Sequence, residues 1–417
     1  MAQLSNDCFA FGGELMTLDE ARALIAERLA PATAVEDVPL VEADGRVLAI
    51  DIAAPVDLPP FDNSAVDGYA VRHHDLAQDG ETSLPVVARV PAGAPHAGAP
   101  AKGTAVRIFT GAPMPDGLDT VFMQEDVRVA GKTVILPPGL KRGANRRLAG
   151  EDLRRGAPAL AAGRRLAPPD IALIAALGLA NVPVRKPLRV AVFSTGDEVV
   201  SPGEALRPAA VYDANRFMLQ AMLRRLACRA TDLGILADEP RALAGALAQA
   251  AAGHDLILTS GGVSTGEEDH VKAAVEAAGA LAFWRIGIKP GRPVAMGVIA
   301  GTPFLGLPGN PVAAYVTFAT VARAVIARLS GESHASPRAF PVAAGFAYRK
   351  KEGRREYVRV RLAADADGRL VAHKHPREGA GVITSLTETE GLVELAEGVT
   401  RIEPGEVLRF LPYDLLR

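Results

Sequence analysis

The chain has 417 residues and a formal net charge of −2, so it is long enough for about three domains. Hydrophobic residues make up 49% and charged residues 23% of the chain, a composition that excludes a disordered protein. The near-neutral charge argues against a general nucleic-acid binder, which normally carries a basic excess. Its two cysteines, Cys8 and Cys228, exclude a disulfide framework and a Cys-rich zinc site.

The sequence predicts a cytoplasmic protein that makes no contact with a membrane. Its first residues lack the basic and then apolar pattern of a signal peptide. The apolar run over 171–180 has half of the about 20 residues that are needed to cross a bilayer.

The first 150 residues predict a helix, a strand-like stretch and a β-rich domain. Residues 17–30 form an amphipathic pattern with Thr17 as the N-cap and Glu20 three residues later, which predicts a capped helix. Residues 38–56 alternate like a strand, with a break at Asp44 and Gly45. Residues 56–150 are rich in Gly and Pro, contain short β-like runs and show no helical period, which predicts a small β-rich domain.

The second half predicts an α/β domain followed by a β-domain. After a connecting helix over 168–179, strands are expected over 188–194, 230–236, 255–260, 281–289 and 302–307, and helices over 213–227, 239–252, 268–279 and 311–329. Strands joined by crossover helices imply a parallel sheet with helices on both faces. Beyond residue 331 the helices stop, and short alternating strands predict a C-terminal β-domain.

Polar turns follow the predicted strands of the α/β domain. They span 194–198 (STGDE), 237–239 (ADE), 260–269 (SGGVSTGEED), 289–292 (KPGR) and 307–311 (LPGNP). In open α/β sheets the ligand binds at the carboxyl ends of the strands. We therefore expect these turns to face one crevice.

The turn at Gly261 and Gly262 suits an anion, because glycines let backbone N–H groups approach a ligand and a helix start follows. Three carboxylates, of Glu267, Glu268 and Asp269, stand at that same helix start and would repel a bare phosphate. A bridging Mg²⁺ resolves the conflict, since Mg²⁺ joins carboxylates to phosphate oxygens. The alternative is that these acids only complement the helix dipole.

The predicted strand over 281–289 contains a second set of residues that suits an anion. Strand periodicity places Arg285, Gly287 and Lys289 on one face, where two cations flank a small residue and Arg292 extends the set. This face predicts a phosphate or oxyanion site. The alternative is a solvated edge strand.

Three further segments are candidates of weaker specificity. Residues 61–70 are dense in short polar side chains, 110–115 form a Pro-framed loop, and 146–152 mix basic and acidic groups. Each segment alone is also explained by turn formation. Asn310 and Pro311 fit the N-cap and first position of a helix. No nucleophile elbow or Cys/His arrangement is present in the sequence, so covalent catalysis is not favoured.

Six of these segments occur together in the order and spacing of one known family. They are PFDNSAVDGYAV (60–71), TGAPMPDGLDTVFMQED (110–126), FSTGDEV (193–199), TSGGVSTGEEDH (259–270), IKPGRP (288–293) and GLPGNP (306–311). With them the chain resembles the molybdenum insertase family, the molybdopterin molybdenumtransferases that include the bacterial MoeA proteins and the E-domain of gephyrin. The resemblance extends from about Thr17 to Pro404.

The resemblance implies a multidomain α/β plus β fold and the catalytic activity of the family. Its expected parts are an elongated linking region (1–55 with 151–180), a β-rich domain (56–150), a three-layer molybdopterin-binding domain (181–331) and a small barrel-like C-terminal domain (332–417). The implied activity is the Mg²⁺-dependent insertion of molybdenum from molybdate into adenylylated molybdopterin, with release of AMP. A homodimer is implied, with the site shared between subunits, together with transient contacts to molybdopterin adenylyltransferase and to apoenzymes that accept the cofactor.

The matching motif positions carry the expected site residues. The catalytic acids would be Asp67, Asp152, Glu198, Asp238 and Asp269, with Glu198 and Asp269 as metal ligands. The substrate-binding residues would be Thr110, Ser194, Thr195, Gly196, Ser260, Gly261, Gly262, Ser264, Arg285, Lys289, Arg292, Pro308, Gly309, Asn310 and Pro311. The chain departs from the family pattern at Arg285, where Lys is common, and at Val66, where Met is usual.

Two other functions remain open from the sequence. The central domain also resembles molybdopterin adenylyltransferase, so the chain is compatible with adenylylation of molybdopterin by Mg-ATP. A non-catalytic scaffold that binds molybdopterin is the second alternative. ATP consumption distinguishes the first from an insertase, and the lack of turnover identifies the second.

Overall fold

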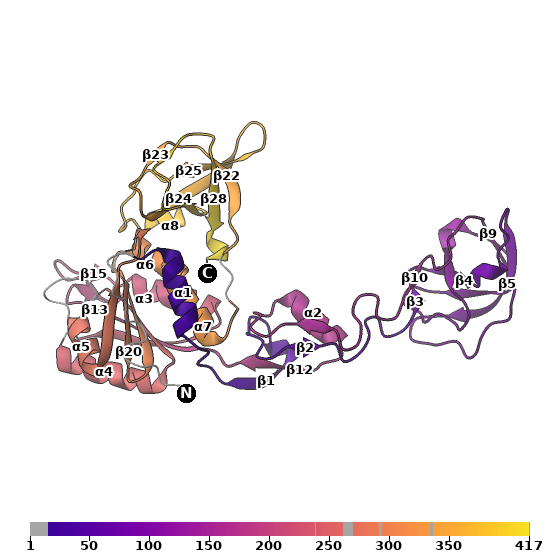
Figure 1. Cartoon of the computed structure of the whole chain (residues 1–417), viewed down its shortest axis with the longest axis horizontal. Helices are drawn as coiled ribbons and strands as arrows, with labels where there is room; N and C mark the ends of the chain where they lie inside the picture. Colours follow the sequence, from indigo (N-terminus) through magenta and orange to yellow (C-terminus); the bar gives the residue numbers. More distant parts are fainter. Residues whose placement is uncertain (1–15, 238, 262–269, 292–293, 334–336, 417) are drawn as a thin grey trace.

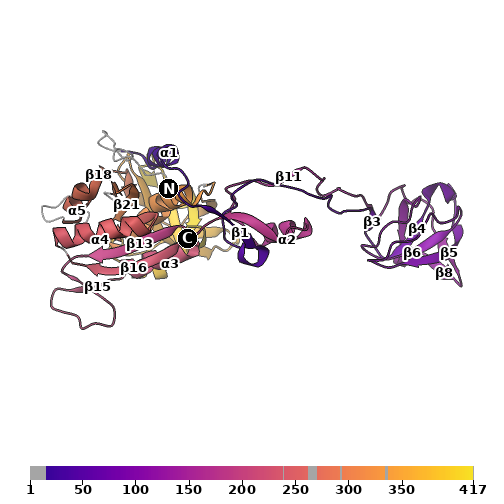
Figure 2. The ribbon, with the colours of Figure 1, turned by 90° about the horizontal axis from the view of Figure 1, so that it is seen from below.

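The computed structural model describes residues 16–237, 239–261, 270–291, 294–333 and 337–416, and every structural statement below concerns these residues. The molecule is elongated (Figures 1 and 2). An α/β domain and the C-terminal β-domain lie together at one end, a linking region extends from them, and the β-rich domain lies at the far end. The expected multidomain α/β plus β architecture is confirmed.

The central sheet has six strands in the order β16-β13-β17-β21-β20-β18. They are β13 (Arg189–Thr195), β16 (Arg229–Leu236), β17 (Leu256–Ser260), β18 (Gly279–Trp284), β20 (Val294–Ile299) and β21 (Thr302–Leu307). β16, β13, β17 and β21 are parallel, but β20 is antiparallel to both of its neighbours. The predicted parallel sheet is therefore confirmed for four adjacent strands, and β20 is an antiparallel strand that the prediction did not include.

The turn between β20 and β21 explains the antiparallel strand. Ile299 pairs with Thr302 across two residues, Ala300 at φ 47° and Gly301 at φ 83°. Two successive positive φ angles match the twist of a tight hairpin. The sequence prediction placed no strand over 294–299 and so missed this hairpin.

Helices cover both faces of the sheet. They are α3 (Asn215–Arg225), α4 (Pro240–Gly253), α5 (His270–Ala278), α6 (Pro311–Thr317), the π-helical turn η4 (Phe318–Ala322) and α7 (Arg323–Ser330). Alternate residues of β13 separate the two cores: Val190 and Val192 pack with α3 and α7, whereas Ala191 and Phe193 pack with α4 and α5. This alternation confirms the expected three layers.

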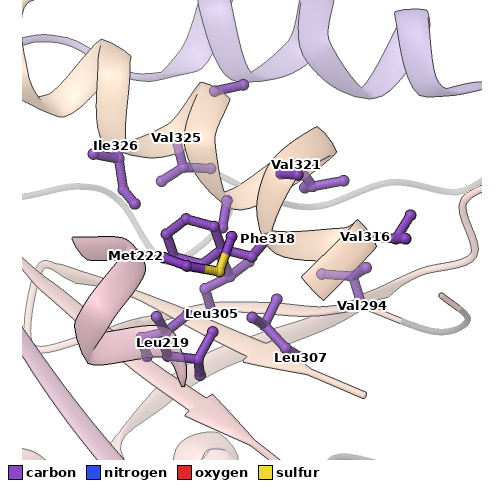
Figure 3. Close-up of a cluster of buried hydrophobic side chains, with 14 of the residues drawn as sticks. Leu219, Met222, Val294, Leu305, Leu307, Val316, Phe318, Val321, Val325 and Ile326 are labelled. Carbon is purple, nitrogen blue, oxygen red and sulfur yellow. The ribbon is translucent and has the colours of Figure 1, made fainter. Parts of the chain in front are cut away.

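Figure 3 shows the larger of these two cores. Phe318 of η4 lies beside Met222 of α3 and above Leu305 of β21. Helix starts follow the predicted capping, since Asn310 is the N-cap of α6 and Pro311 its first residue. Asp213 accepts a hydrogen bond from the Arg216 N–H at 3.2 Å just before α3.

The first helix, α1 (Leu18–Arg28), has the predicted capping box between Thr17 and Glu20. Its buried residues Ala21 and Ile25 belong to the core of the α/β domain, and α1 packs against α7 and η4. The sequence prediction assigned residues 1–55 to the linking region. The apolar face of α1 instead places this helix in the α/β domain.

The linking region consists of short paired strands and one helix. β1 (Val35–Pro39) pairs with β12 (Asn181–Arg185), and β2 (Ile52–Ala53) pairs with β11 (Pro158–Leu160). The 3₁₀ turn η1 (Leu40–Glu42) interrupts the predicted strand over 38–56, and α2 (Pro168–Ala176) is the predicted connecting helix.

The β-rich domain is built on a sheet in the order β7-β4-β6-β5-β9-β8. Its strands are β3 (Asn63–Ser64), β4 (Gly68–Val71), β5 (Thr82–Val90), β6 (Ala105–Ile108), β7 (Thr120–Met123), β8 (Arg128–Ala130), β9 (Thr133–Leu136) and β10 (Arg146–Arg147), with the 3₁₀ turns η2 (His73–Asp75) and η3 (Gln124–Asp126). β3 and β10 pair with each other beside this sheet.

The C-terminal domain is a small closed barrel, because β24 pairs with β26 as well as with β25. Its elements are β22 (Phe340–Ala344), β23 (Tyr348–Arg349), β24 (Arg355–Ala364), β25 (Leu370–Lys374), α8 (Thr384–Thr387), β26 (Gly391–Leu395), β27 (Arg401–Ile402), β28 (Val407–Pro412) and η5 (Tyr413–Leu415). A strand from the α/β region, β19 (Ile288–Lys289), joins this sheet in parallel with β24. Two further short strands, β14 (Val199–Val200) and β15 (Val211–Tyr212), pair beside the central sheet.

One helical stretch of the described chain, Pro311–Ser330, has the length and apolarity of a membrane span. It is longer than the run over 171–180, but 89% of its apolar window is buried inside the protein. The stretch is therefore accounted for as a core helix of the α/β domain.

Candidate functional site

The turns that follow β17 and β21 meet at one edge of the central sheet. Ser260 and Leu307 are in register at the ends of these two strands, and the Gly261 N–H donates to the Leu307 carbonyl at 3.0 Å. A Cβ on Gly309 would lie 3.5 Å from the Cα of Gly261. This is an ordinary contact distance, so the space beside Gly309 would accept a Cβ, whereas Gly261 is favoured by its φ of +91°.

The side chain of Asn215 joins the two turns. Its Nδ2 donates to Ser260 Oγ at 2.9 Å and to the Gly309 carbonyl at 2.6 Å, and Ser260 Oγ donates to the Pro308 carbonyl at 2.9 Å. The sequence prediction missed Asn215, which it treated only as part of a helix. An Asn at the start of α3, two residues after Asp213, is the signal that was available.

The end of β13 presents two buried hydroxyls. Ser194 and Thr195 are 2% and 4% exposed, and neither hydroxyl has a hydrogen-bond partner among the described residues. Buried unpaired hydroxyls are costly, which is typical of positions that a ligand completes. Glu198 follows these residues along the chain and is exposed. Its carboxylate lies close to Gly196 (φ +129°), where an added Cβ would be only 2.6 Å away.

The predicted single strand over 281–289 does not form. β18 ends at Trp284, and β19 leaves the central sheet to pair with β24. Met16 pairs with the segment between the two strands, since its N–H donates to the Arg285 carbonyl at 2.9 Å and its carbonyl accepts from the Gly287 N–H at 2.7 Å. Arg285 lies after the end of β18 and before β19, so no continuous strand relates it to Lys289.

A cavity of about 300 Å³ lies where the α/β domain meets the C-terminal barrel. The α/β domain contributes Lys289, Pro308 and Asn310, which the sequence predicted as substrate-binding residues. The barrel contributes polar residues that the sequence prediction missed: Tyr348, Glu356, Arg359, Lys374, His375 and Glu378. They were missed because they are spread over β23, β24, β25 and the loop after β25, with no turn motif to mark them.

Cations dominate the cavity. Lys289 Nζ lies 3.2 Å from Glu356 Oε2, and Lys374 pairs with Glu378. Arg359 donates to two backbone carbonyls, of Arg377 at 3.2 Å and Gly379 at 3.3 Å, and burial lowers its pKa. Because no carboxylate among these partners neutralises Arg359, its charge is available to an anion.

Asp67 and Thr110 lie together in the β-rich domain. The Thr110 N–H and hydroxyl donate to Asp67 Oδ1 at 2.8 and 2.7 Å, and these bonds lower the pKa of Asp67. The pair sits beside β4 and β6, at the opposite end of the molecule from β13 and β21 (Figure 2). Asp152 is exposed in the linking region, which forms an elongated arm together with the β-rich domain. Its N–H donates to the Leu58 carbonyl at 3.0 Å. The expected site is therefore divided between the two ends of one chain.

Several predicted site residues lie outside the described residues. They are Asp238, Gly262, Ser264, Asp269 and Arg292, together with Glu267 and Glu268. Within the described ranges no group of three or more His, Cys, Asp or Glu side chains is placed to hold a metal ion. Of the two expected magnesium ligands, only Glu198 lies within the described residues. The magnesium site therefore stays a prediction.

Three family profiles match successive parts of the chain. They are the MoeA N-terminal region (domain I and II) over 16–178, the probable molybdopterin binding domain over 191–328 and the MoeA C-terminal region (domain IV) over 341–413. The molybdopterin molybdenumtransferase of Haemophilus influenzae is 37% identical over 404 residues, which cover 96% of this chain and 100% of that protein. The chain belongs to the molybdopterin molybdenumtransferase family.

Other members of this family are similarly close. Molybdopterin molybdenumtransferase 2 of Mycobacterium tuberculosis is 33% identical over 406 residues, with 95% of this chain and 99% of that protein covered. The crystal structure of the molybdopterin biosynthesis MoeA protein from Pyrococcus horikoshii OT3 matches with a TM-score of 0.82 and 28% identity, covering 96% of this chain and 100% of that one. Molybdopterin molybdenumtransferases are transferases. The alignments with this chain cover 99% or more of the Haemophilus influenzae and Mycobacterium tuberculosis proteins.

The contact between Asp67 and Thr110 leads to a direct test. Thr110→Ala removes the hydroxyl that favours the charged carboxylate, so the pKa of Asp67 is expected to rise toward its ordinary value. NMR titration of the Asp67 carboxyl carbon measures the shift. Thr104→Ala in the same domain is the control, since the Thr104 hydroxyl donates to the Ala101 carbonyl instead. An unchanged Asp67 titration in Thr110→Ala would show that the contact does not form in solution.

Proposed function

We propose that this protein inserts molybdenum from molybdate into adenylylated molybdopterin and releases AMP. The observation that carries the proposal is the cavity lined by Lys289, Arg359 and Lys374, beside the turns that follow β17 and β21. Three cations around one small cavity favour an oxyanion. Molybdate and phosphate groups share that chemistry.

The adjacent turns provide the second half of the binding surface. Gly261 and Gly309 bring two backbone segments together, and such glycine turns let N–H groups approach phosphate oxygens. The unpaired hydroxyls of Ser194 and Thr195 offer further donors at the same edge of the sheet. We infer that the pterin phosphate and the adenylyl group extend along this edge from the cationic cavity.

The chain's own contribution is positioning and electrostatics. Lys289 and Arg359 would hold the oxyanion, and Asn215 keeps the two turns at a constant separation through its bonds to Ser260 and Gly309. Such preorganised donors lower the barrier by stabilising charge that develops in the transition state. This proposal assigns no covalent step to a side chain of the protein.

Magnesium is part of the proposal, with Glu198 and Asp269 as its ligands. Glu198 lies at the carboxyl end of β13, next to the buried hydroxyls, and carboxylates suit this hard cation. When bound, Mg²⁺ would neutralise phosphate charge. We also propose that the protein acts in the cytoplasm, with transient contacts to molybdopterin adenylyltransferase and to the apoenzymes that receive the cofactor.

The relatives support the insertase over both alternatives. Proteins named molybdopterin molybdenumtransferase match 95% or more of the chain, including the β-rich arm and the barrel. An adenylyltransferase resembles only the central domain and gives no role to a cavity that the barrel and the α/β domain build together.

We further propose a homodimer in which each site takes Asp67 and Thr110 from the second copy. In both views β4, which begins directly after Asp67, lies far along the arm from the sheet edge of its own chain (Figures 1 and 2). A two-fold arrangement lets each arm reach the other copy's crevice and closes the assembly at two subunits.

The first test of the function measures AMP. Purified protein is mixed with adenylylated molybdopterin, molybdate and Mg²⁺, and AMP is followed without ATP. Lys289→Ala and Arg359→Ala are each expected to slow AMP release about 100-fold, because each removes a donor to the oxyanion. Lys186→Ala, an exposed cation of the linking region, is the matched control. Full AMP release by both cavity variants would refute the proposed site, and a requirement for ATP would favour the adenylyltransferase.

The second test addresses the shared site by subunit complementation. Asp67→Ala and Lys289→Ala are expected to be inactive separately. After unfolding and refolding together, mixed dimers would contain one intact site, and about a quarter of native activity should return. No recovery, despite mixed dimers detected by native mass spectrometry, would place both residues in one subunit's site.

A further inference from the structure

Glu356 is a buried carboxylate inside the cationic cavity. Its side chain is 2% exposed, and its Oε2 accepts hydrogen bonds from Lys289 Nζ at 3.2 Å and from the Tyr348 hydroxyl at 2.9 Å. The other oxygen, Oε1, is also buried but has no hydrogen-bond partner among the described residues. A buried oxygen without a partner is costly, so a hydrogen bond at Oε1 would stabilise this side chain.

Charged and titratable groups surround Glu356. The cavity is lined by Lys289 of β19, Tyr348 of β23, Arg359 of β24, Lys374 and His375 at the end of β25, and Glu378, and Lys350 interacts electrostatically with Glu356 from the turn after β23. The cations outnumber the acids in this set. Burial and the hydrogen bond to Glu356 raise the pKa of Tyr348, so its hydroxyl remains a proton donor.

An oxyanion in the cavity would reverse this balance. It competes with Glu356 for Lys289, and it brings negative charge next to a carboxylate that cannot move into water. An ionised carboxylate only accepts hydrogen bonds, as do the oxygens of molybdate. A proton on Oε1 removes the repulsion and converts the unpaired acceptor into a donor.

We propose that Glu356 is a further ligand of the oxyanion, which it binds in its protonated form, so that one proton enters the cavity with each oxyanion. The proton comes from solvent, an O–H bond forms at Oε1, and this O–H donates to an oxygen of the ligand. No other bond changes. A protonated acid among the ligands favours fully deprotonated oxyanions such as molybdate, because it needs an acceptor oxygen. This inference rests on the proposed oxyanion cavity.

Isothermal titration calorimetry counts the proton. Molybdate is titrated into the full chain at one neutral pH in buffers of different ionisation enthalpy, and sulfate serves as a second dianion. The native protein should take up about one proton per molybdate, and its affinity should fall up to about tenfold for each unit of rising pH. Glu356→Gln should take up close to none, and its affinity should not depend on pH.

Two control variants identify the proton acceptor. His375→Gln and Glu378→Gln remove the other groups in the cavity that can gain a proton, and both should keep the native uptake. Uptake that persists in Glu356→Gln, or that disappears in His375→Gln, would overturn the assignment. Tyr348→Phe gives a second test if Glu356→Gln fails to fold. It removes a donor that favours the ionised acid, so the fall in affinity should begin at higher pH, and an unchanged pH dependence would contradict the inference.

The outcomes also separate this inference from the function on which it rests. Failure of native protein to bind molybdate or sulfate would refute the oxyanion cavity itself. Binding without any proton uptake would refute only the role of Glu356 and would leave the cavity in place.

Discussion

The pairing of β19 with β24 is the contact on which the arrangement of the site depends. These two residues of β19 leave the central sheet, enter the edge of the barrel and place Lys289 beside Glu356. The chain then returns to the central sheet as β20. One short strand thus joins two domains at the edge where the turns after β17 and β21 meet, and the cationic cavity is the result.

The geometry of the central sheet explains why so many polar turns share one edge. β16, β13, β17 and β21 are parallel, so their carboxyl ends point the same way. β18 has the same direction, because the hairpin strand β20 lies antiparallel between it and β21. Hydrophobic packing on both faces holds the strands rigid, and the loops at their ends are left to carry the chemistry. The elongated arm keeps Asp67 and Thr110 away from this edge of their own chain, and the proposed sharing of the site between two copies rests on that separation.

Local patterns were sufficient to predict much of the fold and part of the site. The capping box of α1, the helix start at Asn310 and the strand over 188–194 depend on neighbouring residues, and the structure contains all three. The break at Arg285 was not predictable in this way, because this segment pairs with Met16, which is distant in the sequence. Arg359 and Glu356 were not predictable for a similar reason, since the pairing of β19 with β24, between segments far apart in the sequence, brings Lys289 to them.

The central claim is that the junction between the α/β domain and the barrel binds the oxyanion. Anomalous X-ray diffraction from crystals soaked in molybdate tests it most directly, because molybdenum is located without reference to the protein density. The account predicts an anomalous peak inside the cavity, within contact distance of Lys289 and Arg359. A peak confined to the turn at Glu198, with none in the cavity, would contradict it.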